Sequence, residues 1–116
     1  MLANYVSGNA LAYPILKDGS LAPFDQEIKH HGHGPNKERQ EAAHAHMIYP
    51  FKKNCMYVLD LSLDKAKAYQ LERDSKQWKA VPACDIQIDS GSGARHLVMD
   101  KKEQIAFVLS ELSCLL

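Results

Sequence analysis

The chain has 116 residues, enough for one small domain, and 46% of them are hydrophobic, which is ordinary for a globular protein. The 14 Lys and Arg residues balance the 14 Asp and Glu residues, so the chain lacks the basic excess that nucleic-acid binding or electrostatic attachment to a membrane requires. Its first lysine is Lys17 and its three cysteines are far apart, which predicts a cytoplasmic protein with free thiols and no signal peptide.

The first strand-like segment, residues 2–15, matches residues 58–71 at an offset of 56 residues. In this match Tyr13 falls on Tyr69. The match predicts that the chain begins inside one structural repeat.

The next segment is rich in histidine, since five of the six histidines lie between His30 and His46. Imidazole nitrogens bind zinc and nickel, so these side chains are candidate metal ligands. The candidates are His30, His31, His33, His44 and His46. Their spacing matches no regular zinc pattern, and no cysteine or acidic residue joins them at motif distance. We therefore predict no metal and no other cofactor.

Short strand-like segments separated by turn residues occupy residues 43–88. The predicted order is a strand at 43–49, a turn at 50–54, a strand at 55–61, a tight turn at 64–65, a strand at 66–71, a polar hairpin at 73–77 and outer-strand segments at 78–81 and 85–88. Helix is the rival interpretation for residues 63–80, whose residue types favour it. The equivalent earlier segment carries Pro14 and Gly19, which argues for strands.

A second internal match sets residues 46–62 against residues 96–113 at an offset of 50 residues. It places His46 on His96, and Tyr57 on Phe107. A unit of four short strands with this period is typical of a β-propeller, whose blades bury their faces only against neighbouring blades.

We therefore predict an all-β chain that forms a partial β-propeller of two to three four-stranded antiparallel blades. Residues 1–35 would end one blade, residues 36–90 would form a complete blade, and residues 91–116 would start the next. Because so few blades cannot close a ring, the expected partners include the remaining blades of the propeller or another chain that completes it.

Motifs along nearly the whole chain resemble the seven-bladed propeller lactonases, a family that includes bacterial cytosolic 6-phosphogluconolactonases and fungal carboxymuconate-lactonizing enzymes. The most specific motif is the string Arg-Gln-Glu-x-x-His-x-His at residues 39–46. The other matching stretches are residues 4–21, 57–71 and 91–113. The resemblance implies a segment of about two and a third blades from a seven-bladed ring.

The resemblance also implies a site in the mouth of the propeller channel, built from a histidine, an arginine and a glutamate. Carried over to this sequence, the catalytic residues are His46 or His44, Arg95 and Glu111. The candidates for substrate binding are Arg39, Gln40 and His96.

These residue types suit the hydrolysis of a lactone by direct attack of water. A histidine titrates near neutrality and can act as the base. Arg95 can stabilise the oxyanion or bind an anionic group of the substrate, and Glu111 can orient the imidazole or hold Arg95. The expected substrate is a small sugar lactone, 6-phosphogluconolactone of the pentose phosphate pathway.

Two other functions are consistent with the same resemblance. One is lactone formation by a muconate-type cycloisomerase, which would use the same three side chains. The other is a non-catalytic propeller segment that serves binding or assembly, because one fold hosts many functions. The observation that separates an enzyme from such a segment is whether His46, Arg95 and Glu111 converge.

Overall fold

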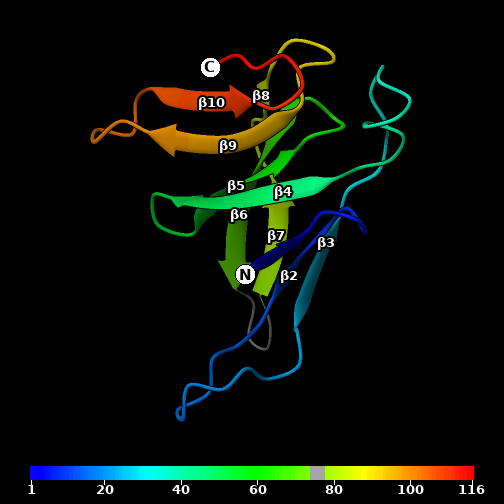
Figure 1. Cartoon of the computed structure of the whole chain (residues 1–116). Coiled ribbons are helices and arrows are strands. Elements are labelled where there is room, and N and C mark those ends of the chain that lie inside the picture. Colours follow the sequence, from blue (N-terminus) through cyan, green and yellow to red (C-terminus); the bar gives the residue numbers. More distant parts are fainter. Residues whose placement is uncertain (74–77) are drawn as a thin grey trace.

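The computed structural model describes residues 1–73 and 78–116, which form three antiparallel sheets (Figure 1). The first sheet holds β1 (Leu2–Asn4), β2 (Asn9–Ala12) and β3 (Gln26–Lys29). The middle sheet holds β4 (Ala45–Phe51), β5 (Cys55–Asp60), β6 (Lys65–Arg73), β7 (Trp78–Pro82) and β8 (Ile86–Gln87). The third sheet holds β9 (Ala94–Met99) and β10 (Ala106–Ser110). The all-β prediction is confirmed. Within the two described ranges, no helix is long and apolar enough to cross a membrane.

Each sheet lies within one of the three predicted blade segments, whose exact boundaries stay a prediction. In the middle sheet two short strands share the outermost position, because β7 and β8 both pair with β6. Between them the chain leaves the ladder, and the Asp85 carboxylate accepts a hydrogen bond of 3.0 Å from the N–H of Ala68. The side chain thus satisfies a backbone donor that would otherwise be unpaired.

The helical alternative for residues 63–80 is wrong, because the described part of this stretch forms β6 and the start of β7. Successive side chains of a strand point to opposite faces, so Ala66 packs toward the third sheet and Tyr69 toward the first. Packing on both faces outweighs the helix propensity of the charged residues. The predicted hairpin at residues 73–77 lies, apart from Arg73, outside the described residues.

Strand β4 starts and ends two residues later than the predicted strand at residues 43–49. Pro50 lies inside the strand opposite Met56, although the sequence suggested a turn there. β4 is an edge strand of its sheet, where a residue without an N–H is tolerated. His44 precedes the strand, and its backbone N–H donates a hydrogen bond to the Asp60 side chain.

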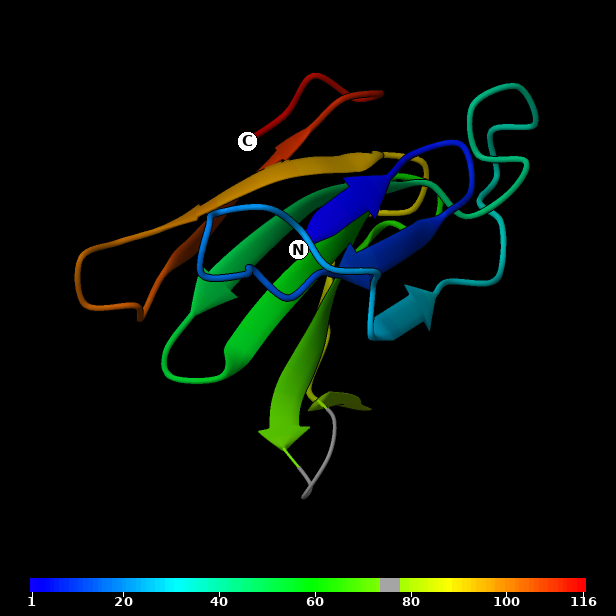
Figure 2. The ribbon, with the colours of Figure 1, turned by 90° about the horizontal axis from the view of Figure 1, so that it is seen from below.

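The three sheets lie next to one another (Figure 2), and two apolar cores lie between them. The core between the first and middle sheets is formed by Ala10, Ile28, Ala45, Met56, Val58 and Tyr69. The core between the middle and third sheets is formed by Leu59, Ala66, Ala94 and Leu97. The middle sheet is therefore buried on both faces, as a propeller blade between two neighbours must be.

Strands β4 and β9 each contain a β-bulge at the same place. The pairs that flank the bulges are Ala45–Asp60 and Met47–Leu59 in the middle sheet, and Ala94–Ser110 and His96–Leu109 in the third sheet. The residues skipped by the ladder are His46 and Arg95, so these two are structurally equivalent. The sequence match of His46 with His96 is therefore wrong by one residue. The cause is that the segment from Ala94 to Ser110 is one residue longer than the equivalent segment from Ala45 to Asp60.

Candidate active site

His46, Arg95 and Glu111 converge at one end of the two neighbouring inner strands. The Glu111 carboxylate is the centre of the cluster: its Oε2 lies 3.8 Å from Nε2 of His46 and 3.4 Å from Nη1 of Arg95. Its other oxygen, Oε1, accepts a hydrogen bond from the guanidinium of Arg39. The three predicted catalytic groups therefore meet within contact distance, and Arg39 joins them from the loop that precedes β4.

The His46 ring is enclosed by aromatic neighbours on two sides. Tyr5 and His96 both meet it edge to face, with ring centroids 5.8 Å and 5.4 Å away. Burial lowers the pKa of His46 below its ordinary value, and the charges of Arg95 and His96 lower it further against the opposing charge of Glu111. His46 is therefore a neutral imidazole at neutral pH, which is the form that can accept a proton.

Glu111 is held as a carboxylate by its cationic neighbours. The hydrogen bond from Arg39 lowers its pKa below the ordinary value; burial opposes this, and the charges of Arg39 and Arg95 add to the lowering. In return, the hydrogen bond to Glu111 raises the pKa of Arg39. One carboxylate between two guanidinium groups leaves the cluster with a net positive charge, which suits an anionic substrate.

The Asp64 side chain supports the loops that carry these groups. It accepts hydrogen bonds of 2.7 Å from the backbone N–H groups of Gly91 and Gly93, just before Arg95. The carbonyl of Gly93 then accepts a hydrogen bond of 2.8 Å from the N–H of Glu111. A carboxylate that is 3% exposed thus fixes the backbone on both sides of the third-sheet hairpin.

Gln40 belongs to this support and not to the cluster. Its side chain is fully buried, and its amide nitrogen donates 2.9 Å hydrogen bonds to the Leu61 carbonyl and to Oδ1 of Asp64. Its amide oxygen accepts a hydrogen bond from the N–H of Asn36. The predicted substrate contact of Gln40 disagrees with this position, because its amide is closed to a ligand and bonds only to protein groups. These bonds hold the loop that carries Arg39.

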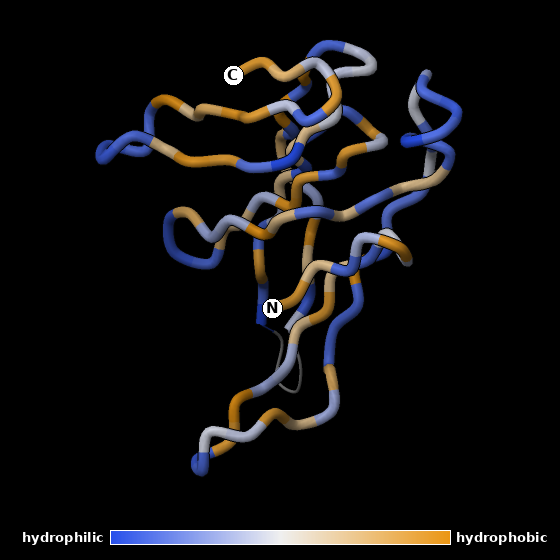
Figure 3. The backbone as a smooth tube through the Cα atoms, in the orientation of Figure 1, coloured by the Kyte–Doolittle hydropathy of each residue, from blue (hydrophilic) through white to orange (hydrophobic). Residues whose placement is uncertain are grey.

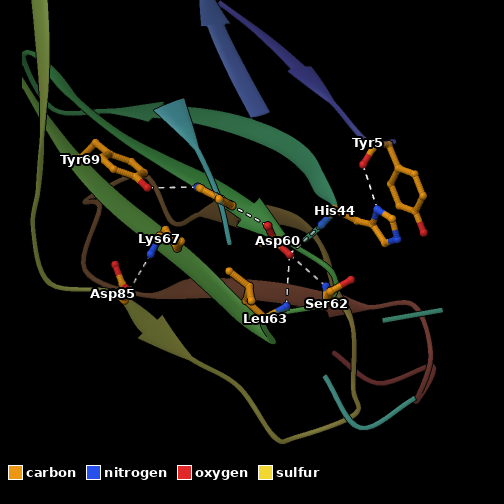
Figure 4. Close-up of polar contacts among 9 residues, drawn as sticks. Tyr5, His44, Asp60, Ser62, Leu63, Lys67, Tyr69 and Asp85 are labelled. Atoms are coloured by element: carbon orange, nitrogen blue, oxygen red, sulfur yellow. Dashed lines mark hydrogen bonds and ion pairs between the residues drawn. The ribbon is translucent and has the colours of Figure 1, made fainter. Parts of the chain in front are cut away.

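His44 also lies apart from the cluster, in the contact between the first and middle sheets (Figure 4). Its ring is buried and stacks on Tyr5 at 4.3 Å, with Nδ1 2.9 Å from the Tyr5 carbonyl. Its Nε2 lies 3.0 Å from the Glu41 carboxylate. The catalytic assignment of His44 disagrees with this geometry, because both ring nitrogens already have hydrogen-bonding partners in the protein. Of the two alternatives, His46 is the one at the cluster.

A buried polar network below His44 explains one further histidine. Nδ1 of His30 lies 2.6 Å from the Asp60 carboxylate, and the Tyr69 hydroxyl lies 3.1 Å from Nε2 of His30. Burial, followed by the charges of Asp85 and Asp60, raises the pKa of Tyr69 to about 12, so its hydroxyl stays protonated. His30 is a structural link between two sheets. Within residues 1–73 and 78–116, no three His, Cys, Asp or Glu side chains are grouped to hold a metal.

Tyr5 is the site residue that the sequence did not reveal. It lies in the turn after β1, so it reaches His46 from a different sheet. No motif spacing records such a contact, because it depends on how two sheets pack against each other.

Comparison with known proteins gives the family. A family model described as lactonase, 7-bladed beta-propeller, matches residues 1–115. The chain belongs to this lactonase family. The resemblance that the motifs implied is thereby confirmed, and so is the fold class of a partial β-propeller.

Individual lactonase relatives agree. The chain is 35% identical over 114 residues to the 6-phosphogluconolactonase of Bacillus subtilis, covering 97% of this chain and 31% of that protein. A proposed 6-phosphogluconolactonase from Bacteroides fragilis superposes with a TM-score of 0.86 at 28% identity, covering 94% of this chain and 33% of that one. A protein from Lactobacillus plantarum superposes with a TM-score of 0.84 at 33% identity, covering 96% and 31%. The lactonase segment described here thus spans about a third of the length of its relatives.

Proposed function

We propose that this chain is a segment of a sugar-lactone hydrolase that acts on 6-phosphogluconolactone. The observation that carries the proposal is the convergence of His46 and Arg95 on Glu111, at 3.8 Å and 3.4 Å, in a chain of the lactonase family. The similarity to a 6-phosphogluconolactonase supports the choice of substrate.

The proposed reaction is attack of water on the lactone carbonyl. Nδ1 of His46 is buried, so Nε2 is the ring nitrogen that can meet a water molecule. His46 takes a proton from this water as the new C–O bond forms, and Arg95 stabilises the negative oxygen of the tetrahedral intermediate. The ring C–O bond then breaks, and the imidazolium returns the proton to the leaving alkoxide. Glu111 holds Arg95 and Arg39 in place through its two oxygens.

Substrate binding is proposed for Arg39 and His96. Arg39 is exposed at the rim of the cluster, where a guanidinium can exchange part of its contact with Glu111 for a phosphate or hydroxyl group. His96 is exposed beside His46 and can donate a hydrogen bond to the same ligand.

Further blades are the proposed partners of this segment. Val98, Phe107 and Leu109 form an apolar face on the third sheet, here called the open face, and are 55%, 44% and 41% exposed. Hydrophobic residues run along both strands of this sheet (Figure 3). Phe107 and Leu109 are equivalent to Tyr57 and Leu59, which pack in the core of the middle sheet. The open face therefore suits another blade. All three cysteines are free thiols, which supports the proposed cytoplasmic location.

The proposal is tested by hydrolysis of 6-phosphogluconolactone by the protein that contains this chain, measured above the spontaneous rate by the formation of 6-phosphogluconate. We expect His46→Ala and Arg95→Met to lose most of the activity, while Lys101→Met, which removes an exposed charge in the β9–β10 turn, keeps it. Equal rates for His46→Ala and the unaltered protein would rule out His46 as the base. Absence of hydrolysis in the unaltered protein would reject the hydrolase altogether.

A further inference from the structure

Tyr5 is placed to connect the first sheet with the proposed catalytic histidine. Its ring lies face to face on His44, with an angle of 8° between the planes, and meets His46 edge to face at 86°. The two histidines thus share one aromatic neighbour, although it is His46 that lies beside Glu111. Edge-to-face and stacked contacts of this kind restrict the rotation of each ring.

The stack with His44 gives Tyr5 a rigid base. The Tyr5 carbonyl can only accept a hydrogen bond, so Nδ1 of His44, at 2.9 Å, must carry the proton and donate it. The backbone N–H of His44 in turn donates to the Asp60 carboxylate. The position of the phenol ring is thus fixed by the buried network between the first two sheets.

We propose that Tyr5 is a positioning residue of this site, whose aromatic ring fixes the ring plane of His46. The proposal deepens the proposed function and rests on it for the catalytic role of His46. The Tyr5 ring limits the rotation of the His46 imidazole and excludes water from one side of it. Tyr5 also makes the site depend on the packing of two sheets, since Tyr5 follows β1 of the first sheet whereas His46 lies in β4 of the middle sheet.

The first test needs no turnover and uses the titration of His46 followed by the chemical shifts of its ring nitrogens. We expect Tyr5→Leu to admit water to the ring and raise the titration midpoint by roughly half a unit, since burial is the main cause of the low pKa of His46. Arg95, His96 and Glu111 face the same ring and stay unchanged in this variant. Tyr5→Phe keeps the ring and should keep the midpoint. Tyr13→Leu is the matched control, because Tyr13 contacts Phe24 in the connection between β2 and β3.

The second test separates the ring from the hydroxyl by steady-state kinetics on 6-phosphogluconolactone. Tyr5→Phe keeps the ring and should leave both kcat and KM nearly unchanged. Tyr5→Leu should lower kcat about tenfold, because a misplaced base reacts slowly. If the unaltered protein hydrolyses no lactone, the proposed function fails while the titration still decides the role of Tyr5. A His46 titration that is identical in Tyr5→Leu and the unaltered protein would overturn the proposal about Tyr5.

Discussion

His46 and Arg95 occupy the same bulged position in two neighbouring inner strands, and this equivalence brings an imidazole and a guanidinium together. In each strand the ladder skips one residue, so its side chain is released from the alternation that buries its neighbours. The same structural position thus carries a neutral imidazole in one blade and a guanidinium in the next. The repeat supplies the geometry, and the difference between the two side chains supplies the chemistry.

The pH dependence of hydrolysis should report the charges around His46. Because the reaction needs the neutral imidazole, kcat/KM should rise with pH through the pKa of His46, which lies below its ordinary value. Glu111 opposes the lowering of this pKa, so Glu111→Gln should move the acidic limb to still lower pH. Arg95 contributes to the lowering, so Arg95→Met should move the limb to higher pH.

The measurement is kcat/KM between about pH 4 and pH 8, where an unperturbed histidine would titrate. Shifts of roughly half a unit are expected for each variant. Lys101→Met provides the control, since it removes a cation from the far end of the same hairpin. A limb that moves in the same direction in Glu111→Gln and Arg95→Met would contradict the assignment of the limb to His46.

The two histidines of the His-x-His motif should respond differently to truncation. His46→Ala should lower kcat/KM by about 10²–10⁴-fold, the usual contribution of a general base, with little change in the free energy of unfolding. His44→Ala should instead lower the free energy of unfolding by about 2 kcal/mol, because it removes a buried ring, its stack on Tyr5 and two hydrogen bonds. Urea unfolding beside the kinetic assay separates the two outcomes. Equal losses of activity and stability in both variants would show that the histidines act as a pair.

Much of the architecture could be read from the sequence, because strands, turns and repeats are local signals. The alternation of Ala66 and Ala68 with Tyr69 and Leu71 was enough to place β6. The set of His46, Arg95 and Glu111 was implied by the resemblance to the lactonase family, and the structure brings the three side chains together. The bulges were not predictable, since a ladder that skips one residue leaves no composition signal, and the assignment of His46 to His96 failed for that reason.

The roles of Gln40 and His44 could not be predicted because they depend on burial. Both lie inside the most specific motif of the chain, but their side chains are buried and bond to the protein groups that hold the loops of the site. A motif records which residues a fold requires and does not separate those that hold a loop from those that touch a ligand. Tyr5 shows the converse, because its contact with His46 crosses from one sheet to another.

Acid should weaken the contact between the first two sheets through Asp60. Burial alone would raise the pKa of this carboxyl, but hydrogen bonds from His30 and from the His44 N–H hold it below its ordinary value. A folded pKa below the unfolded one means that ionised Asp60 adds stability above about pH 4, and that this stability is lost as the pH falls through the folded pKa. Asp60→Asn should lower the free energy of unfolding at pH 7 by about 3 kcal/mol and flatten its dependence on acid.

Urea unfolding at pH 7 and at successively lower pH measures this effect. Asp25→Asn is the control, because Asp25 is an exposed carboxylate in the same part of the chain as His30. The prediction fails if acidification destabilises Asp60→Asn as steeply as the unaltered chain.

Two glycines with the same backbone requirement should differ in their tolerance of alanine. Gly8 and Gly19 both have positive φ, at 61° and 85°, so alanine is strained at either position by about 1 kcal/mol. A Cβ on Gly8 would lie 2.3 Å from the Ala43 carbonyl oxygen, whereas nothing lies within 4 Å of one on Gly19. Gly8→Ala should therefore cost more than about 3 kcal/mol and push the first sheet away from His44. Thermal unfolding of the two variants should show a clearly larger drop for Gly8→Ala; equal drops would contradict the close contact.

The open face should make the isolated 116-residue chain associate. Val98, Phe107 and Leu109 present apolar side chains at positions that the middle sheet buries, and β10 is an edge strand with unpaired backbone groups. Light scattering at increasing concentration should reveal particles heavier than a monomer. Phe107→Lys with Leu109→Lys should shift the population toward the monomer, because burying two charges against a second molecule is costly.

Val6→Lys tests whether any exposed apolar residue would do the same. Val6 is 89% exposed in the turn after β1, at a distance in sequence and structure from the open face. It should leave the association unchanged, whereas the double variant should abolish it while the circular dichroism of the strands persists. Contiguous apolar patches normally mark an interface, so an unaltered chain that stays monomeric at about 100 µM would contradict this prediction.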